Sequence, residues 1–299
     1  MLREMVNGFC MALADSVPGV SGGTVAFIMG FYDKFIGSIN SLVFGNMDEK
    51  KKSAVYLVKL GAGWLIGMLM AVIALSALFE NHIYVVSSLF IGFIAGAIPL
   101  IINEERENIK QVTKGIVFCF IGALLVVMIT FLNGRSGNAS MDLSVFSISV
   151  SVKLFFIGMV AISAMFLPGI SGSTLLLIFG AYIPVISAIR GVLAFNISYV
   201  PDLIFFGCGV LAGAVLVVRI IKYCLDRFRV QTVYMIIGMM LGSFYAIVMG
   251  PVTLKVSQPP LSFGRFNIPA AVAGVVLVFG MQVMKDSSML QRKKEKATY

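Results

Sequence analysis

Two short segments gather hydroxyl groups and glycines in a chain that is otherwise apolar. One is ADSVPGVSGGT at residues 14–24, and its near-copy is AMFLPGISGST at residues 164–174. Each holds a proline–glycine pair, which breaks a helix because proline lacks an N–H group and restricts the residue before it. Each then supplies serine, glycine and threonine, whose hydroxyl and backbone N–H groups donate hydrogen bonds to anions. These residue types therefore suggest the binding of an anion such as phosphate.

The elements that carry these segments are predicted to be membrane helices. The 299 residues are 59% hydrophobic and 12% charged, and their mean hydropathy is +0.98. Such values lie far outside the range of soluble globular domains and indicate an all-α polytopic membrane protein. Apolar runs of roughly the 20 residues that a membrane span needs occupy 55–79, 83–102, 113–132, 202–225, 232–250 and 267–284. Regions 5–45 and 152–197 hold the two segments, and each is expected to form a broken or re-entrant helical hairpin.

Each segment is predicted to divide its hairpin into two helices. The first helix should end near Val17 or Leu167, and the next should start at residues 21–22 or 171–172, where a serine can cap it. A helix start carries unpaired N–H groups and about half a positive charge, which favours an anion. We therefore predict that two helix starts enclose one phosphate through Ser21, Gly22, Gly23, Thr24, Ser171, Gly172, Ser173 and Thr174. The helix breaks themselves are assigned to Pro18, Gly19, Pro168 and Gly169.

The two segments belong to an internal repeat. At an offset of 150 residues, eleven of the 29 positions from 8 to 36 are identical, and they include proline, glycine, serine, threonine and tyrosine. At an offset of 146, glycines of the first half align with glycines of the second, namely Gly61, Gly63, Gly67, Gly92 and Gly96 with Gly207, Gly209, Gly213, Gly238 and Gly242. We interpret these ten glycines as positions where helices pack closely.

The repeat predicts the domain organisation and the topology. Residues 1–132 form repeat 1 and residues 152–285 form repeat 2, each a hairpin followed by three transmembrane helices. Residues 133–151 are an outer linker, and residues 286–299 are a basic cytoplasmic tail. Because three is an odd number of spans, the second repeat is inverted relative to the first. Inverted repeats with matched glycine and proline interruptions are typical of transporters whose site lies between the two halves.

Positive charge is distributed as in a membrane protein whose two termini are cytoplasmic. The formal net charge is +9, and in this orientation seventeen of the 23 Lys and Arg residues flank cytoplasmic ends of the spans. The basic residues lie in short loops and not on an aromatic-rich soluble face, so we expect no nucleic-acid partner. Residues 50–52 and the C-terminal QRKKEK are expected to contact anionic membrane lipids, or to reflect the topology alone.

Charged residues at membrane depth are candidates for function. Asp15 precedes the first break, where it could carry a proton or orient the loop, and Met165 takes its place in the second copy. Arg219 could reach the membrane interface or contact the anion. We treat Asp15 and Arg219 as possible coupling or gating residues. Asp33 and Lys34 could pair with each other.

The chain lacks the residue patterns of a metalloprotein or an enzyme. The cysteines have neither CxxC nor metal-ligand spacing, and there are four: Cys10, Cys119, Cys208 and Cys224. His82 is the only histidine, so a lipid phosphatase or phosphotransferase would find few groups for acid–base chemistry. We predict no metal site, no cofactor and no enzymatic activity.

Three segments resemble the signature segments of the PopT family of bacterial membrane proteins: ADSVPGVSGGTVAFIMGFYD, ISAMFLPGISGSTLLLIFGAY and TVYMIIGMMLGSFY. The resemblance covers most of the chain. It implies that the chain returns undecaprenyl phosphate, the lipid carrier for cell-wall polymers, from the outer to the cytoplasmic leaflet of the bacterial inner membrane. The chain departs from the family at Phe166, where isoleucine is frequent, and in FYAIVMGP, which lacks the tryptophan common before that proline.

This implied function agrees with the predicted site. Moving a phosphate through hydrocarbon exposes charge at a cost of many kcal/mol, whereas a polyprenyl tail is soluble there. A flippase needs to shelter only the headgroup, so we expect the helix starts to bind phosphate while the tail stays in lipid through a lateral opening. The alternative is a small inorganic-anion channel or exchanger that uses the same broken-helix site.

Overall fold

The computed structural model describes residues 2–15, 21–106, 112–135, 147–169, 172–193, 195–253 and 258–297. Helices are the only regular elements in these ranges: α1 (Leu2–Asp15), α2 (Gly22–Ile28), α3 (Tyr32–Phe44), α4 (Met47–Glu104), α6 (Val112–Arg135), α7 (Ile148–Phe166), α8 (Gly172–Ile178), α9 (Tyr182–Leu193), α10 (Val200–Arg227), α11 (Arg229–Met249) and α12 (Ile268–Ala297). Short 3-10 helices lie at Ile197–Tyr199, Gly250–Thr253 and Phe263–Arg265. The predicted all-α fold is confirmed.

Over the described ranges, six segments are long and apolar enough to cross a membrane: Met47–Ala71, His82–Asn103, Gly115–Leu132, Ile148–Phe166, Ile197–Arg227 and Arg229–Val252. Five of them correspond to predicted spans, and Ile148–Phe166 belongs to the second hairpin. The last predicted span, 267–284, contains a shorter apolar helix, Ile268–Gly280, and α12 continues into the predicted tail. The spans predicted at 55–79 and 83–102 meet at a kink in α4, where His82 leaves helical geometry (φ −135°, ψ 36°).

Both hairpins have the same order of a longer helix, a break, a short helix and a returning helix. α1, α2 and α3 have 14, 7 and 13 residues, and α7, α8 and α9 have 19, 7 and 12. The short helices end alike, with Gly30 and Gly180 at φ values of 67° and 66°. The residue after each glycine donates its N–H to the carbonyl five residues earlier, at 3.0 Å in the first hairpin and 2.8 Å in the second. This helix ending needs a left-handed residue, for which glycine has no steric cost.

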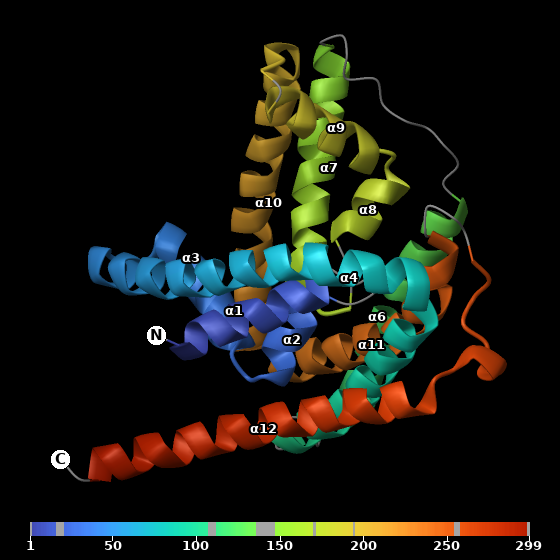
Figure 1. The fold of residues 1–299 in the computed structure, drawn as a ribbon. Coiled ribbons are helices and arrows are strands. Elements are labelled where there is room, and N and C mark those ends of the chain that lie inside the picture. The colour runs from blue at the N-terminus through green and yellow to red at the C-terminus, as the bar shows by residue number, and fades with distance from the viewer. Residues whose placement is uncertain are drawn as a thin grey trace.

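Glycines allow the helices to pack in matched pairs. α1 runs along the first part of α4, and α7 runs along α10 (Figure 1). A Cβ on Gly63 would overlap the Met5 carbonyl, and one on Gly209 would overlap the Phe155 carbonyl. The packing interpretation is confirmed at Gly63, Gly67, Gly92, Gly96, Gly209, Gly213, Gly238 and Gly242. It is wrong at Gly61 and Gly207, where an added Cβ would meet no atom within 4 Å.

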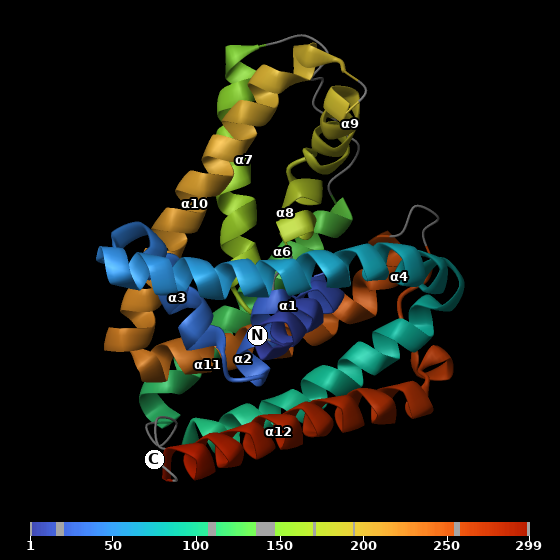
Figure 2. The ribbon, with the colours of Figure 1, turned by 60° about the vertical axis from the view of Figure 1, so that its left-hand side comes forward.

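The third span of each predicted repeat packs on the other repeat. α6, from the first half, lies along α11, and α12, from the second half, lies along the second part of α4 (Figure 2). Gly238 approaches the Cys119 backbone in the first of these contacts, and Gly92 approaches the Ala271 backbone in the second. The two halves therefore interlock and do not form separate bodies.

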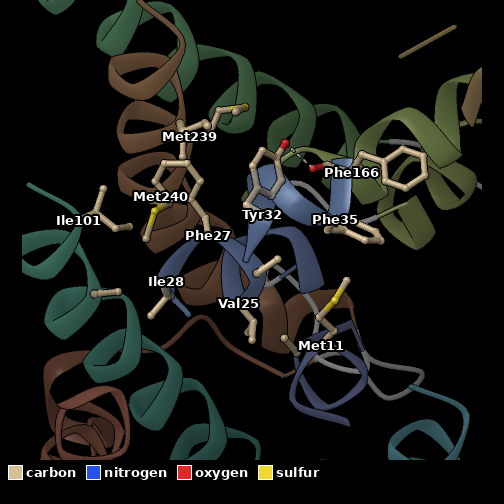
Figure 3. Close-up of a cluster of buried hydrophobic side chains, with 14 of the residues drawn as sticks. Met11, Val25, Phe27, Ile28, Tyr32, Phe35, Ile101, Phe166, Met239 and Met240 are labelled. Carbon is tan, nitrogen blue, oxygen red and sulfur yellow. Dashed lines mark hydrogen bonds between the residues drawn. The ribbon is translucent and has the colours of Figure 1, made fainter. Parts of the chain in front are cut away.

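The short helix α2 lies at the centre of the molecule. All seven of its residues are buried. They belong to a core to which α3, α4, α7 and α11 also contribute, and Figure 3 shows Phe27 and Tyr32 in this core with Phe166 and Met239. Because α2 is buried, its polar groups need hydrogen-bond partners. α2 therefore lies where both halves meet.

Candidate functional site

The start of α2 meets the second helix break inside the molecule. The Ser21 hydroxyl donates to the Leu167 carbonyl oxygen at 3.0 Å. The Gly169 backbone N–H donates to the Thr24 hydroxyl oxygen at 2.9 Å. Ser21 and Thr24 are each 1% exposed, so these bonds replace contacts with water that burial has removed. Hydroxyl groups at the start of α2 thus hold backbone groups that the second break leaves outside its helices.

The helix that follows the first break has a capped start. α2 begins at Gly22, and the Ser21 hydroxyl oxygen accepts from the Gly23 N–H at 3.0 Å. The same hydroxyl donates to the second break, so both of its hydrogen-bonding functions are used. A Cβ on Gly23 would lie 2.8 Å from the Phe166 carbonyl oxygen. Glycine is therefore required for this close approach of the two hairpins.

The second break is a stretch of non-helical backbone after α7. Leu167 is extended (φ −84°, ψ 129°), and Gly169 has a φ of +87°, in the region that favours glycine. The Ser243 hydroxyl, on α11, lies 3.2 Å from the Gly169 carbonyl oxygen and 2.9 Å from the Met239 carbonyl oxygen. The second break therefore contacts α2 on one side and α11 on the other.

Tyr32 makes a third bond between the hairpins. Its hydroxyl donates to the Phe166 carbonyl oxygen at 2.9 Å (Figure 3), and the residue is 2% exposed. A carbonyl in the last turn of a helix has no partner within that helix, so the bond satisfies a group that would otherwise be buried unpaired. Sequence comparison within the chain identified Tyr32 only as a matched position of the repeat.

Asp15 lies where an anion would lie at the start of α2. Its carboxylate accepts from the Gly22 N–H at 2.6 Å and from the Trp64 indole N–H at 2.9 Å. The N–H groups and the dipole at a helix start favour a carboxylate for the same reason that they favour a bound anion. The sequence-based prediction does not include Trp64. Trp64 is the single tryptophan of the chain, and this could have marked it as a candidate site residue.

A cavity of about 270 Å³ lies beside Asp15 and Trp64. Met165 and Gly172 line it from the second hairpin, so the start of α8 shares this cavity with Asp15. The remaining lining residues are apolar: Met68, Ala161, Ile162, Leu176, Phe206 and Val210. The structure thus brings Asp15 and Gly172, one predicted residue from each hairpin, to one cavity.

The remaining predicted residues are placed as follows. Outside the described part of the chain lie Pro18, Gly19, Ser171 and the side chain of Ser173. Thr174 is partly buried in α8, and Pro168 lies in the turn after α7. Arg219 holds its guanidinium 4.9 Å from the Phe44 ring centroid in a cation–π contact. Arg219 lines none of the three cavities described in this article.

A charged cluster, absent from the sequence-based prediction, joins α11 to the first half. Arg229 donates to Glu105 at 3.1 and 2.5 Å, and to Asp33 at 2.9 Å. Glu105 is 8% exposed, and a cavity of about 330 Å³ opens beside these groups. Asp33 therefore pairs with Arg229 and not with Lys34, whose ammonium lies 4.2 Å from the Tyr56 ring centroid. In the described ranges, no three His, Cys, Asp or Glu side chains are grouped so that they could hold a metal ion.

The chain is similar to polyprenyl-phosphate transporters. Residues 11–262 match a family model described as undecaprenyl phosphate translocase-like. The chain is 36% identical over 251 residues to the polyprenyl-phosphate transporter of Staphylococcus aureus (strain NCTC 8325 / PS 47). The match covers 83% of this chain and 86% of that relative. It is 29% identical over 252 residues to the polyprenyl-phosphate transporter of Vibrio cholerae serotype O1 (strain ATCC 39315 / El Tor Inaba N16961). That match covers 81% of this chain and 76% of the relative. No solved structure matches.

Proposed function

This chain belongs to the undecaprenyl phosphate translocase-like family, and we propose that it moves undecaprenyl phosphate from the outer to the cytoplasmic leaflet of the bacterial inner membrane. It is a multi-pass membrane protein of a transporter family and not an enzyme. In the proposed orientation both termini are cytoplasmic, and residues 50–52 and the basic tail lie against anionic lipids. The transport would return the carrier lipid for further rounds of cell-envelope synthesis.

The headgroup sets the physical problem that such a protein must solve. A phosphate monoester carries one to two negative charges, and hydrocarbon offers it no hydrogen bonds, at a cost of many kcal/mol. The polyprenyl tail meets no such barrier. A polar site at membrane depth, reached from both faces in turn, is therefore sufficient for transport.

We place the phosphate where the two helix breaks meet. The observation that carries this proposal is the pair of hydrogen bonds that joins the breaks through Ser21 and Thr24. They bring donors from both hairpins, the Ser21 hydroxyl and the Gly169 N–H, to one buried position. A phosphate that enters would accept these bonds in place of the protein acceptors. The other proposed phosphate-binding residues are Gly22, Gly23, Ser171, Gly172, Ser173 and Thr174.

Asp15 is proposed to gate this site. Its carboxylate holds the Gly22 N–H at 2.6 Å, so an ionised Asp15 repels a phosphate and competes with it for the same donor. The carboxylate must therefore be displaced or protonated when the phosphate arrives. Arg219 remains a proposed coupling residue whose cationic side chain would favour the approach of the anion.

The interlocked third spans limit which parts can move. Because α6 packs on α11 and α12 packs on α4, a rigid rotation of one whole half would break both contacts. We propose that two bodies related as inverted repeats, the hairpin α1–α3 with the first part of α4 and the hairpin α7–α9 with α10, rock against a scaffold of α6, α11, α12 and the second part of α4. Each movement would break the bonds between the helix breaks and open the phosphate site to one face.

Transport by purified protein in proteoliposomes tests this function. Wild type should move undecaprenyl phosphate between leaflets, and a variant with Ser21, Thr24, Ser171 and Thr174 changed to alanine should lose at least tenfold in rate. Thr130→Ala, which removes a hydroxyl that donates to its own helix at 2.9 Å, should keep the wild-type rate. Passage of small anions without movement of lipid phosphate would instead support an inorganic-anion channel or exchanger. Wild type that moves neither would contradict both functions.

A further inference from the structure

A third, larger cavity runs beside the second helix break. Its volume is about 660 Å³, and it lies among α6, α7, α10 and α11. At one end it touches Leu167 and Met239, close to the second break. It then extends along α11 to Phe228 and Gln231, where α10 passes into α11. The cavity is distinct from those beside Asp15 and Arg229.

The walls of this cavity offer hydrocarbon contacts. Leu167, Val217, Ile221, Met235, Ile236 and Met239 line it. Three hydroxyls in the wall donate to backbone carbonyls, that of Ser163 to Met159 at 2.6 Å, that of Thr232 to Phe228 at 2.9 Å and that of Tyr32 to Phe166 at 2.9 Å. The one side-chain amide of the lining, that of Gln231, lies at the end where α10 passes into α11. These hydroxyls are therefore not the specific donors that a polar ligand would require. Apart from Gln231 at that end, the lining suits an apolar ligand.

The cavity shares two residues, Leu167 and Tyr32, with the contact between the hairpins. Leu167 lines it, and the carbonyl of the same residue accepts the Ser21 hydroxyl at 3.0 Å. Tyr32 also lines it, and the Tyr32 hydroxyl donates to Phe166 at 2.9 Å. An amphiphile whose phosphate lies at the breaks would therefore have the first part of its chain at the end of this cavity. The polar and apolar parts of one lipid would then each find a matching site.

The cavity opens toward the lipid-facing surface. Phe118, Ile220 and Phe228 line it and are 37%, 51% and 46% exposed. All three lie on or beside segments that are apolar and long enough to cross a membrane. A volume of about 660 Å³ is within the range of roughly 300–1,000 Å³ that holds a drug-sized ligand. It therefore accommodates the beginning of a long chain, with the remainder outside in the bilayer.

We propose that this cavity binds the isoprene units nearest to the phosphate of the transported lipid. The inference rests on the proposed function and extends it, because it assigns part of the tail to the protein and not to the bilayer. Binding would then depend on the chain as well as on the headgroup. An isoprenoid alcohol without phosphate would compete for the site, whereas a phosphate monoester without a chain would bind weakly.

The test is equilibrium binding of radiolabelled undecaprenyl phosphate to the full-length protein in nanodiscs. Val217→Trp fills the cavity and should weaken binding at least tenfold. Leu216→Trp is the matched control, because Leu216 is 51% exposed and is not in the cavity lining, and it should bind as wild type does. Undecaprenol should displace the label. Equal displacement by phosphatidic acid would show an ordinary acyl-chain groove and overturn the isoprenoid assignment.

A measurement on unmodified protein covers the case in which Val217→Trp does not fold. Undecaprenyl phosphate with a photoactivatable group on its first isoprene units should label α10 and α11 between residues 217 and 239. Labelling confined to α12 would overturn the inference. If wild type binds and transports the lipid but the two tryptophan variants behave alike, the cavity assignment alone fails. If wild type neither binds nor transports it, the proposed function fails as well.

Discussion

Thr24→Val tests the bond between the two helix breaks with little change in shape. Valine replaces the hydroxyl with a methyl group, so the substitution leaves no void at a residue that is 1% exposed. The Gly169 N–H then loses its acceptor at 2.9 Å. A buried N–H group without a partner costs about 1–3 kcal/mol. We therefore expect the free energy of unfolding to fall by about 1–3 kcal/mol.

The matched control is Thr130→Val in α6. The Thr130 hydroxyl donates at 2.9 Å to Val126, one turn earlier in its own helix, and the helix supplies that carbonyl with a backbone donor. We expect a change within about 0.5 kcal/mol. Unfolding in mixed detergent and SDS micelles, followed by circular dichroism, measures both variants. Equal stability of the two variants would refute the reasoning, because it would mean that Gly169 does not depend on Thr24.

Three further predictions follow from other contacts. Gly63→Ala should destabilise the protein by about 1–3 kcal/mol through overpacking, because Gly63 lies against the neighbouring backbone. Gly61→Ala should be neutral or slightly stabilising, because Gly61 has no such contact. Similar losses of stability for the two variants in SDS titration would contradict this prediction. Tyr32→Phe should cost about 1 kcal/mol in the same titration, because the Phe166 carbonyl loses its donor, and wild-type stability would disprove that role. Asp15→Asn should bind undecaprenyl phosphate more tightly in nanodiscs and transport it more slowly in proteoliposomes, and weaker binding would contradict the gating role.

The sequence predicts the local features of this fold because they depend on neighbouring residues. The proline–glycine pair at 168–169 locates the second helix break, and Ser21 next to Gly22 marks a capped helix start. The spacing of Gly63 and Gly67 predicts a close helix contact, which the structure contains. Gly61 shares the same pattern without a contact, because spacing alone does not fix which side of a helix meets its neighbour.

The partners of the site residues could not be predicted because they come from distant parts of the chain. Asp15 is held by Trp64, 49 residues away, and Arg229 bonds to Asp33, 196 residues away. Asp33 was expected to pair with Lys34 because the two are adjacent in the sequence. Adjacent residues on a helix do not face each other, however. The packing of each third span on the other half could not be predicted either, because an internal repeat shows which segments are similar and not which segments are in contact.

The most direct test of the phosphate site is a solid-state NMR measurement on the lipid-bound protein. Carbonyl-¹³C proline with ¹⁵N glycine selects only the Pro18–Gly19 and Pro168–Gly169 amides, because the chain has no other Pro–Gly pair. If the phosphate binds where the breaks meet, the ³¹P nucleus of bound undecaprenyl phosphate should dephase the Gly169 amide signal. A saturated complex in which ³¹P dephases neither amide would contradict the account.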